Sequence, residues 1–278
     1  MTIQNEVESR LRPVSSRQNA LVKELRKAFA QAEPTAEGAL AIEGLRVIEE
    51  AIRSGLRFDA VFFSQSGRGH AARLLPQISS HAEALLLPDD VFASAAGTET
   101  PQGVAALVRL KPAKLDDLLD QVTSDLLLVA VAGIQDPGNL GTIIRSAEAF
   151  SARAVLLGEK TVSHFNAKAV RASAGSLFRE PLVRVKLAET ITLLKQHGVR
   201  VLATSSHKGR PLPEADFTGA SMIVIGGEGA GLPAEILSLA DELITIPHSP
   251  RVESLNAGIA ASIILYEAAR QRGMKTVT

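Results

Sequence analysis

The sequence of 278 residues contains no cysteine, which excludes disulfides, thiolate metal sites and cysteine nucleophiles and suits a reducing compartment. Its N-terminus lacks the apolar core that a signal peptide needs. No apolar run approaches the roughly 20 residues of a membrane-spanning helix. We therefore expect a cytoplasmic protein that does not enter a membrane.

Two common kinds of catalytic site are also missing from the sequence. The six histidines show no metal-ligand spacing, and no paired-carboxylate motif appears. The G-x-S-x-G elbow of a Ser/His/Asp hydrolase is absent. We therefore expect neither a metal site nor a serine hydrolase.

The chain has no excess of charge, because 30 basic residues balance 30 acidic ones. This argues against a protein that holds nucleic acid by its total charge, and it leaves local patches possible. One patch lies in residues 1–27, where six basic residues face three acidic ones. A helix predicted to start at residues 16–19 turns Lys23, Arg26 and Lys27 away from its apolar face, toward either solvent or phosphate.

Apolar residues make up 46% of the chain, enough for a sizeable core, and the length favours two domains. Residues 1–110 alternate short strands and helices and form a predicted α/β domain, and residues 111–124 form a linker with a short helix. In residues 125–278 the strands are nearly continuous apolar runs, as in parallel strands covered on both faces. We predict a parallel α/β sheet there, with strands at 125–133, 152–158, 181–185, 199–205, 221–227 and 242–247.

The first loop of interest, residues 135–141, follows a strand of this sheet, where open α/β sheets bind ligands. Asp136-Pro137-Gly138 is typical of a turn, and Asn139 fits a helix N-cap. Arg145 follows within the first turns of the helix, where a cation is slightly unfavourable. Arg145 is therefore either a phosphate-binding residue or an ordinary surface arginine.

The second loop, residues 226–232, has the sequence GGEGAGL, and its four glycines let backbone approach a ligand closely. It fits neither G-x-G-x-x-G nor a phosphate loop, since no Gly-Lys-Ser/Thr is present. Glu228 would also repel a pyrophosphate. An adenosine or amino-acid ligand suits this loop better than a dinucleotide.

The third loop joins the last strand to a long helix rich in small residues, within residues 244–271. The strand ends at Pro247, and we expect the helix to begin at residues 252–256. Ser254 and Asn256 are either a cap and a turn residue or part of a ligand site, and both interpretations fit this segment. One apolar stripe of the helix consists of Leu255, Ile259, Ile263 and Tyr266.

Taken together, the three loops resemble the motifs of SpoU-type (TrmH-like) RNA 2′-O-ribose methyltransferases of the SPOUT class. The matching patterns are N-x-G-x-x-x-R, then G-G-E-G-x-G-L, then I-P…S-L-N, in this order along the chain. The N-terminal half resembles the ribosomal-protein-like RNA-binding domain that precedes the catalytic domain in rRNA-modifying members. The segments SSRQNALVKEL, ALAIEGLRVIEEAI and TPQGVAALV carry that match.

The resemblance implies a catalytic α/β domain whose C-terminal part threads into a deep trefoil knot, against the rule that chains are unknotted. It implies S-adenosylmethionine as cofactor, RNA and most of all rRNA as substrate, no metal, and a homodimer with its active site near the subunit interface. The cofactor-binding residues that it implies are Thr204, Gly226, Gly227, Ile246, Leu255 and Asn256.

The implied reaction transfers a methyl group from a sulfonium to a ribose 2′-hydroxyl, which must lose its proton or be polarised. The resemblance assigns that role to Arg145. Guanidinium groups hold their proton to about pH 12 or above, so we favour Arg145 as a stabiliser of phosphate and alkoxide rather than as a base. The remaining implied catalytic residues, which would orient Arg145 and the ribose, are Asn139, Glu228, Ser254 and Asn256.

The sequence departs from the family pattern twice in the third loop. The family commonly has methionine after Ile-Pro and glycine two residues later, where this chain has His248 and Pro250. The change concerns the shape of the loop more than the cofactor site, so we expect an active enzyme. The alternatives are a tRNA 2′-O-methyltransferase, a catalytically silent RNA-binding or ribosome-assembly protein, and a nucleotide-dependent oxidoreductase.

Overall fold

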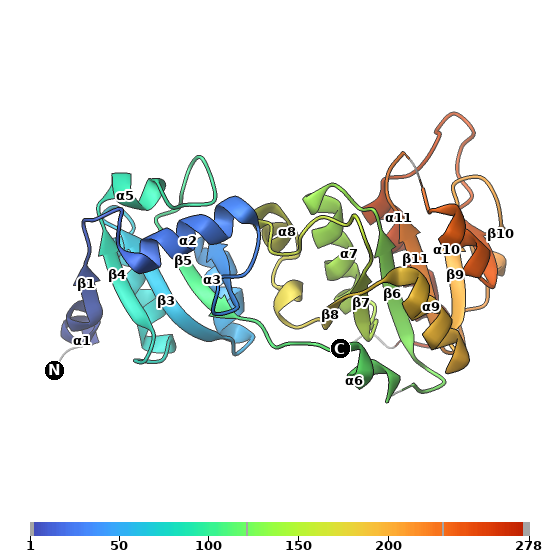
Figure 1. Cartoon of the computed structure of the whole chain (residues 1–278), viewed down its shortest axis with the longest axis horizontal. Coiled ribbons are helices and arrows are strands. Elements are labelled where there is room, and N and C mark those ends of the chain that lie inside the picture. Colours follow the sequence, from blue (N-terminus) through green and yellow to red (C-terminus); the bar gives the residue numbers. More distant parts are fainter. Residues whose placement is uncertain (1–2, 121, 230, 275–278) are drawn as a thin grey trace. The chain divides into compact units, whose positions relative to one another are not determined.

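The computed structural model describes residues 3–120, 122–229 and 231–274 (Figure 1). Gln121 of the predicted linker and Ala230 of the glycine-rich loop therefore lie outside the described residues. In the described part of the chain, no helix is long and apolar enough to cross a membrane.

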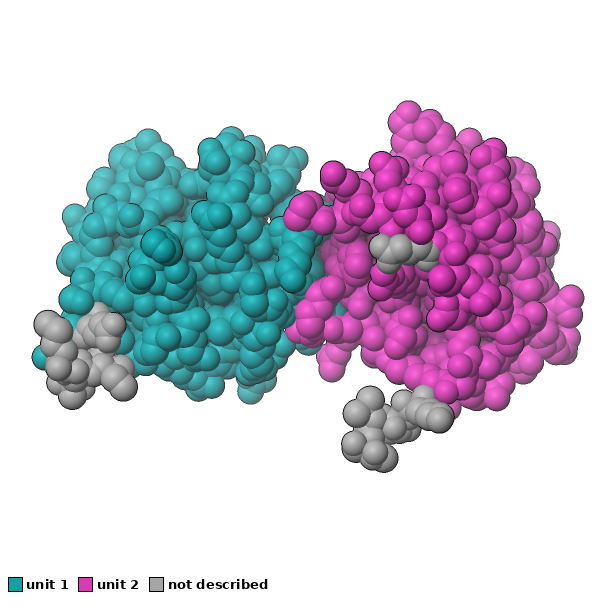
Figure 2. All heavy atoms as spheres, turned by 90° about the horizontal axis from the view of Figure 1, so that it is seen from below, with its two compact units in different colours: residues 1–111, 163–178 teal, residues 112–162, 179–278 magenta. Residues whose placement is uncertain are grey.

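The chain divides into two compact units, which are coloured separately in Figure 2. The first contains residues 1–111 and 163–178, and the second contains residues 112–162 and 179–278. The domain boundaries expected from the sequence, at residues 110 and 125, stay a prediction.

A five-stranded sheet in the order β1-β4-β3-β5-β2 forms the centre of the first unit. β4 pairs in parallel with β1 and β3, whereas β5 pairs antiparallel with β3 and β2. β1 was not predicted; it is three residues long, includes Pro13 and lies at the sheet edge, where proline is tolerated. The strands are β1 (Leu11–Pro13), β2 (Ala39–Glu43), β3 (Arg57–Ser64), β4 (Glu83–Leu87) and β5 (Val104–Arg109).

The helix start predicted at residues 16–19 is confirmed for α2 (Ala20–Gln31), whereas α1 (Ile3–Arg10) was not predicted. Asn19 caps α2, because its side chain accepts a hydrogen bond from the backbone N–H of Leu21 at 3.0 Å. Gly55 follows α3 with a φ of +66°, the left-handed conformation that glycine adopts after a helix. The α-helices are α1 (Ile3–Arg10), α2 (Ala20–Gln31), α3 (Leu45–Arg53), α4 (Ala71–Leu74), α5 (Asp89–Ala93) and α8 (Ala167–Ala172).

The second unit contains a seven-stranded sheet in the order β10-β12-β9-β11-β6-β7-β8, and all its pairings are parallel. The six predicted strands are confirmed. β10 was missed, since it has two residues, one of them Pro211. The strands are β6 (Leu127–Ala132), β7 (Ala154–Leu157), β8 (Leu182–Arg184), β9 (Arg200–Thr204), β10 (Arg210–Pro211), β11 (Ser221–Gly226) and β12 (Glu242–Thr245).

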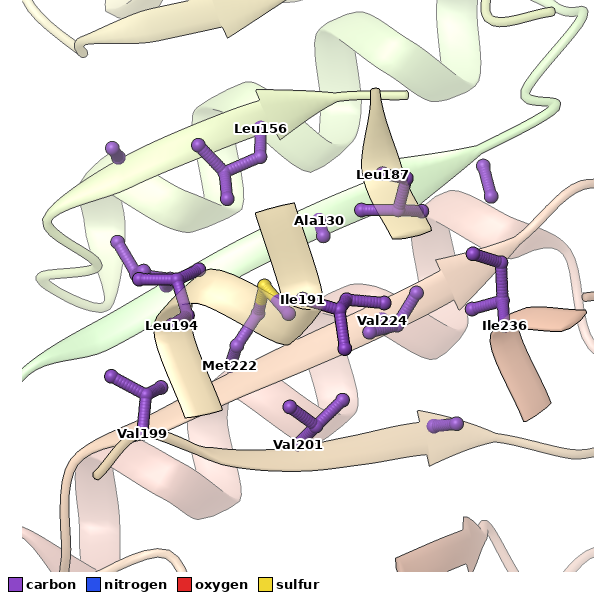
Figure 3. Packing of buried hydrophobic residues seen from close by; sticks show 14 of the residues in the cluster. Ala130, Leu156, Leu187, Ile191, Leu194, Val199, Val201, Met222, Val224 and Ile236 are labelled. Carbon is purple, nitrogen blue, oxygen red and sulfur yellow. The ribbon is translucent and has the colours of Figure 1, made fainter. Parts of the chain in front are cut away.

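Helices cover both faces of this parallel sheet. Ala130 of β6 packs in one core cluster with Ile191 of α9 and Ile236 of α10 (Figure 3). Val129 and Val131 are equally buried and point to the opposite face by strand alternation. The fold class is confirmed as a parallel α/β sheet with a separate N-terminal domain, while the knot stays a prediction. The α-helices are α6 (Leu115–Leu119), α7 (Pro137–Ala149), α9 (Leu187–Gln196), α10 (Ala234–Leu239) and α11 (Ala257–Gln271).

Candidate functional site

A pocket of about 400 Å³ lies at the carboxyl edge of the parallel sheet. Thr204 ends β9, Gly226 ends β11, and Ile246 follows β12, and all three line the pocket. Carboxyl ends of parallel strands meet at one edge, so segments far apart in sequence converge there. Part of the lining is apolar, with Leu232, Leu237, Leu255 and Ile264.

Most of the predicted cofactor residues line this pocket. They are Thr204, Gly226, Gly227, Ile246 and Leu255, whereas Asn256 is not a lining residue. Their roles stay predictions. The pocket is also lined by Ser205, Ser206 and His207, which were not predicted. Their position directly after a strand was the available signal.

The glycine-rich loop folds back tightly on the strand edge. A Cβ atom on Gly227 would lie 2.2 Å from the carbonyl oxygen of Gly133, and one on Gly226 would lie 2.8 Å from the carbonyl carbon of Gly231. The backbone N–H of Gly227 donates to Ala132 at 2.9 Å, and that of Gly231 donates to Gly227 at 3.1 Å. Gly226 and Gly227 therefore present backbone atoms, rather than side chains, at this wall of the pocket.

One hydrogen-bond network joins the three predicted loops. The Glu228 carboxylate accepts hydrogen bonds from the side-chain amide of Asn139 and, at 2.9 Å, from that of Asn256. The amide of Asn256 also donates to the Oδ1 atom of Asn139 at 2.9 Å. The backbone N–H of Ala257 lies 3.4 Å from the same Glu228 oxygen. The structure therefore brings together three of the five predicted catalytic residues.

The helix caps at this site differ from the predicted ones. Asp136 caps α7 by accepting from the backbone N–H of Asn139 at 3.0 Å, so the prediction of Asn139 as the cap is wrong. α11 begins at Ala257, later than predicted, and Asn256 caps it by accepting from the N–H of Ile259 at 3.1 Å. Ser254 is exposed, lines the pocket and is not the cap.

Arg145 lies apart from the network. Its side chain is exposed on α7, and it forms no hydrogen bond or ion pair with any described residue. The expected hydrogen bonds between Arg145 and Asn139, Glu228, Ser254 or Asn256 are thus not present among the described residues. Six helical residues separate Asn139 from Arg145, a rotation of about 240° that turns the two side chains to different faces of α7.

α7 and α11 pack against each other in parallel. Their contacts recur every four residues on both helices, as expected for one face of each. A Cβ on Gly258 would lie 3.1 Å from Thr142, so glycine permits this close approach. Two further contacts join the helices. The hydroxyls of Ser146 and Ser262 are 2.7 Å apart, and the rings of Phe150 and Tyr266 meet edge to face with their centroids 5.9 Å apart.

Arg145 lies on the same side of this helix pair as exposed apolar residues. Arg145 precedes the contact residue Ser146, and Ile263 follows the contact residue Ser262. Successive residues are rotated by about 100° about the axis of a right-handed helix. The residue before a contact on one helix and the residue after the matching contact on a parallel helix therefore point to the same side of the pair. Ile263 is 37% exposed, and its stripe neighbours Ile259 and Tyr266 are 53% and 58% exposed.

Both departures from the family pattern have a local structural role. The Nδ1 atom of His248 lies 2.7 Å from the carbonyl oxygen of Ile246, within hydrogen-bond distance. The backbone N–H of Val252 donates to the carbonyl of Ser249 at 3.0 Å, which places Pro250 at the second position of a turn. Proline favours that position because its φ is already fixed there. The third loop is therefore shaped by hydrogen bonds of its own.

The geometry agrees with the comparisons to known proteins. A model described as the SpoU rRNA Methylase family matches residues 126–266, the part of the chain that contains all three loops. The chain belongs to this family. A second model, described as an MRM3-like substrate binding domain, matches residues 19–106.

Relatives of this SpoU family member match it over nearly its whole length. The 23S rRNA (guanosine(2553)-2′-O)-methyltransferase RlmP of Bacillus subtilis is 33% identical, over 92% of this chain and 98% of its own. The AdoMet-bound rRNA methyltransferase of Sinorhizobium meliloti superposes with a TM-score of 0.81 at 28% identity, over 96% of this chain and 100% of its own. The SpoU methyltransferase AviRb of Streptomyces viridochromogenes, in complex with AdoMet, reaches 0.78 at 29% identity, over 93% and 100%.

Proposed function

We propose that this protein transfers a methyl group from S-adenosylmethionine to a ribose 2′-hydroxyl of rRNA. The observation that carries the proposal is the hydrogen-bonded network of Asn139, Glu228 and Asn256 beside the 400 Å³ pocket. It joins the three motif loops in one place, as a site assembled around one cofactor and one substrate requires. The name of the relative RlmP, a 23S rRNA 2′-O-methyltransferase, supports rRNA as the substrate.

The pocket suits a cofactor that carries a sulfonium cation. Among its described lining residues there is no lysine or arginine, and the carboxylate of Glu228 lines it. Gly226 and Gly227 leave backbone at one wall, which a Cβ atom would close. When bound, the cofactor supplies an electrophilic methyl group. The apolar wall with Leu232, Leu255 and similar residues favours the loss of charge that accompanies the transfer.

The chain's own residues then have two separate tasks. Glu228 fixes the amides of Asn139 and Asn256 through charge-assisted hydrogen bonds, so these groups orient the ribose without reorganisation. Arg145 has an exposed guanidinium free of partners in the described structure, and it is available to the RNA phosphate and the developing alkoxide. Ser254 lines the pocket and adds a hydroxyl near the ribose.

The protein acts as a homodimer in this proposal. The exposed stripe of Ile259, Ile263 and Tyr266 is an apolar surface that a second copy covers. Because Arg145 lies on the same side of the α7–α11 pair, a dimer through this stripe places Arg145 at the subunit interface. The active site then forms near that interface.

Only some of the basic side chains near the N-terminus are free to contact RNA in this proposal. Arg26 donates to the carbonyl and hydroxyl of Ser94 at 2.9 and 3.1 Å, and Arg17 pairs with Asp90 at 2.7 Å. Lys23 and Lys27 are exposed one turn apart on α2, without a partner among the described residues. We assign RNA phosphate contacts to these two lysines. An rRNA substrate fits the cytoplasmic location expected from the sequence.

The test is methyl transfer itself. Purified protein is incubated with labelled S-adenosylmethionine and unmodified 23S rRNA, 16S rRNA or tRNA transcripts, and labelled nucleosides are identified after digestion. We expect a 2′-O-methylated nucleoside from rRNA. Label in tRNA alone would replace rRNA by tRNA as the substrate. No label on any transcript, together with undetectable cofactor binding by calorimetry, would favour a silent RNA-binding protein.

A further inference from the structure

A second hollow, of about 590 Å³, adjoins the cofactor pocket on the side of the third loop. The two share five lining residues, which are Ser206, His207, Ile246, His248 and Glu253. Arg251 contributes a guanidinium to the lining, and His207 and His248 contribute ring nitrogens, whereas one described lining residue, Glu253, is acidic.

The two histidine rings lie close together in the lining of this hollow. Their centroids lie 6.4 Å apart at an interplanar angle of 35°. The Nδ1 atom of His248 faces the carbonyl oxygen of Ile246 at 2.7 Å, and because a carbonyl only accepts, Nδ1 holds the proton. Nε2 of His248 is the nitrogen left for a ligand.

The turn of the third loop presents Arg251 at this hollow. Pro250 and the hydrogen bond from Val252 to Ser249 fix the turn, so little conformational freedom is lost on binding. The Arg251 side chain is exposed, and no described residue accepts a hydrogen bond from its guanidinium. An unpaired arginine on a fixed turn beside two histidines is suited to an oxyanion.

We propose that this hollow binds a backbone phosphate of the RNA that flanks the methylated ribose. The inference rests on the proposed function, which puts the ribose in the adjoining pocket. A nucleic-acid strand carries one phosphate per nucleotide, so a ribose held there brings a neighbouring phosphate within reach of the hollow. The competing anion is the carboxylate of the cofactor. The phosphate is favoured because Pro250 and Arg251 are exposed, so an RNA chain can reach them.

The experiment compares the full chain with Arg251→Gln and His248→Gln. Affinity for an unmodified 23S rRNA transcript is measured by filter binding at several salt concentrations, and affinity for S-adenosylmethionine by calorimetry. We expect Arg251→Gln to weaken RNA binding about tenfold and to lower the slope of log affinity against log salt by about 0.7. His248→Gln weakens RNA binding in the same direction. Arg251→Gln keeps the cofactor affinity of the unmodified chain, because Arg251 is not among the described residues that line the cofactor pocket.

The matched control is Arg184→Gln, which removes one exposed arginine from β8, at the edge of the sheet opposite β10 and β12. If Arg251→Gln binds RNA as the control does, the inference is overturned. Weaker cofactor binding with unchanged RNA affinity would assign the hollow to the cofactor carboxylate instead. Arg251-dependent RNA binding without any methyl transfer would overturn the proposed function, and it would reduce this inference to an RNA phosphate bound at the hollow.

Discussion

The side-chain amide of Asn256 donates a hydrogen bond to the Oδ1 atom of Asn139 at 2.9 Å, although 117 residues separate them in the chain. Glu228, on a third loop, accepts from both amides. Each of the three side chains thus restricts the rotamers of the other two. The loop or helix that carries one of them could not do this without the other two loops. Such a network is worth more than its separate hydrogen bonds, because the loss of one member leaves the others unpaired.

Glu228→Ala should lower turnover more than cofactor affinity. Without the carboxylate, the amides of Asn139 and Asn256 lose their common acceptor and reorient, and a misplacement of about 1 Å costs up to a hundredfold in rate. Steady-state kinetics with rRNA and calorimetry with S-adenosylmethionine check this. Glu235→Ala, an exposed glutamate on α10, is the control. Equal losses of rate in both variants would remove Glu228 from the site.

Arg145→Ala should abolish most turnover while the cofactor still binds. Arg145 is not among the described pocket-lining residues and forms no hydrogen bond or ion pair with a described residue, so its removal should disturb neither the pocket nor the network. Loss of one charged group that stabilises a transition state costs about a hundredfold to a thousandfold in kcat. Arg145→Lys should recover part of the rate. Parallel loss of cofactor affinity and rate would indicate a structural role instead.

Gly227→Ala should disrupt the pocket wall. The added methyl group would lie 2.2 Å from the Gly133 carbonyl oxygen, so the loop or the end of β6 must move. Such overpacking destabilises by about 1 to 3 kcal/mol, and displacement of the loop should also weaken cofactor binding. Thermal unfolding and calorimetry measure the two effects. Gly219→Ala is the control, since a Cβ there meets no atom within 4 Å; an equal effect of both substitutions would contradict the crowding argument.

Long buried strands were predictable, whereas short edge strands were not. β6 and β11 are six residues each and buried on both faces, so they leave continuous apolar runs in the sequence. β1 and β10 have three and two residues, and each includes a proline. β1 and β10 pair because a longer strand lies beside each of them. Their own residues form no pattern from which a strand could be predicted.

The candidate site was predictable in its loops and not in its contacts. Asp136 and Asn139 are both good caps, and the proline after Asp136, at the first helical position, was the signal that distinguishes them. The separation of Arg145 from Asn139 also follows from helix periodicity, because six residues turn the helix by about 240°. The contact between α7 and α11 depends on tertiary packing. The sequence of either helix alone therefore does not show that Arg145 and Ile263 lie on the same side of the α7–α11 pair.

Glu180 should make the protein less stable as the pH rises. Burial, followed by the nearby charge of Glu148, raises the pKa of Glu180 from its ordinary 4.5 to about 7. Between about pH 4.5 and 7 the folded chain holds a proton that the unfolded chain has released, so the free energy of unfolding contributed by this group falls through that window. Its Oε2 atom is buried without a hydrogen-bond partner in the described structure.

Glu180→Gln should remove this loss of stability. At pH 8 the variant should be more stable by about 1 to 2 kcal/mol, a figure reduced for the solvent that reaches this half-buried side chain. At pH 4.5 the two proteins should be nearly equal. Urea unfolding at both pH values measures the difference. The exposed Glu214→Gln serves as control, and a pH-independent effect of Glu180→Gln would refute the assignment.

The exposed stripe on α11 predicts the effect of charge on dimerisation. Ile259 and Ile263 are 53% and 37% exposed in the single chain, and a second copy covering them removes apolar surface from water. The double substitution Ile259→Asp, Ile263→Asp puts two carboxylates on the surface that the proposed dimer buries, and it should raise the dimer Kd at least about a hundredfold. Sedimentation equilibrium measures this. Met274→Asp, also at an exposed apolar residue (48%), should dimerise normally. A double variant that dimerises like the unmodified chain would place the interface elsewhere and leave Arg145 outside it.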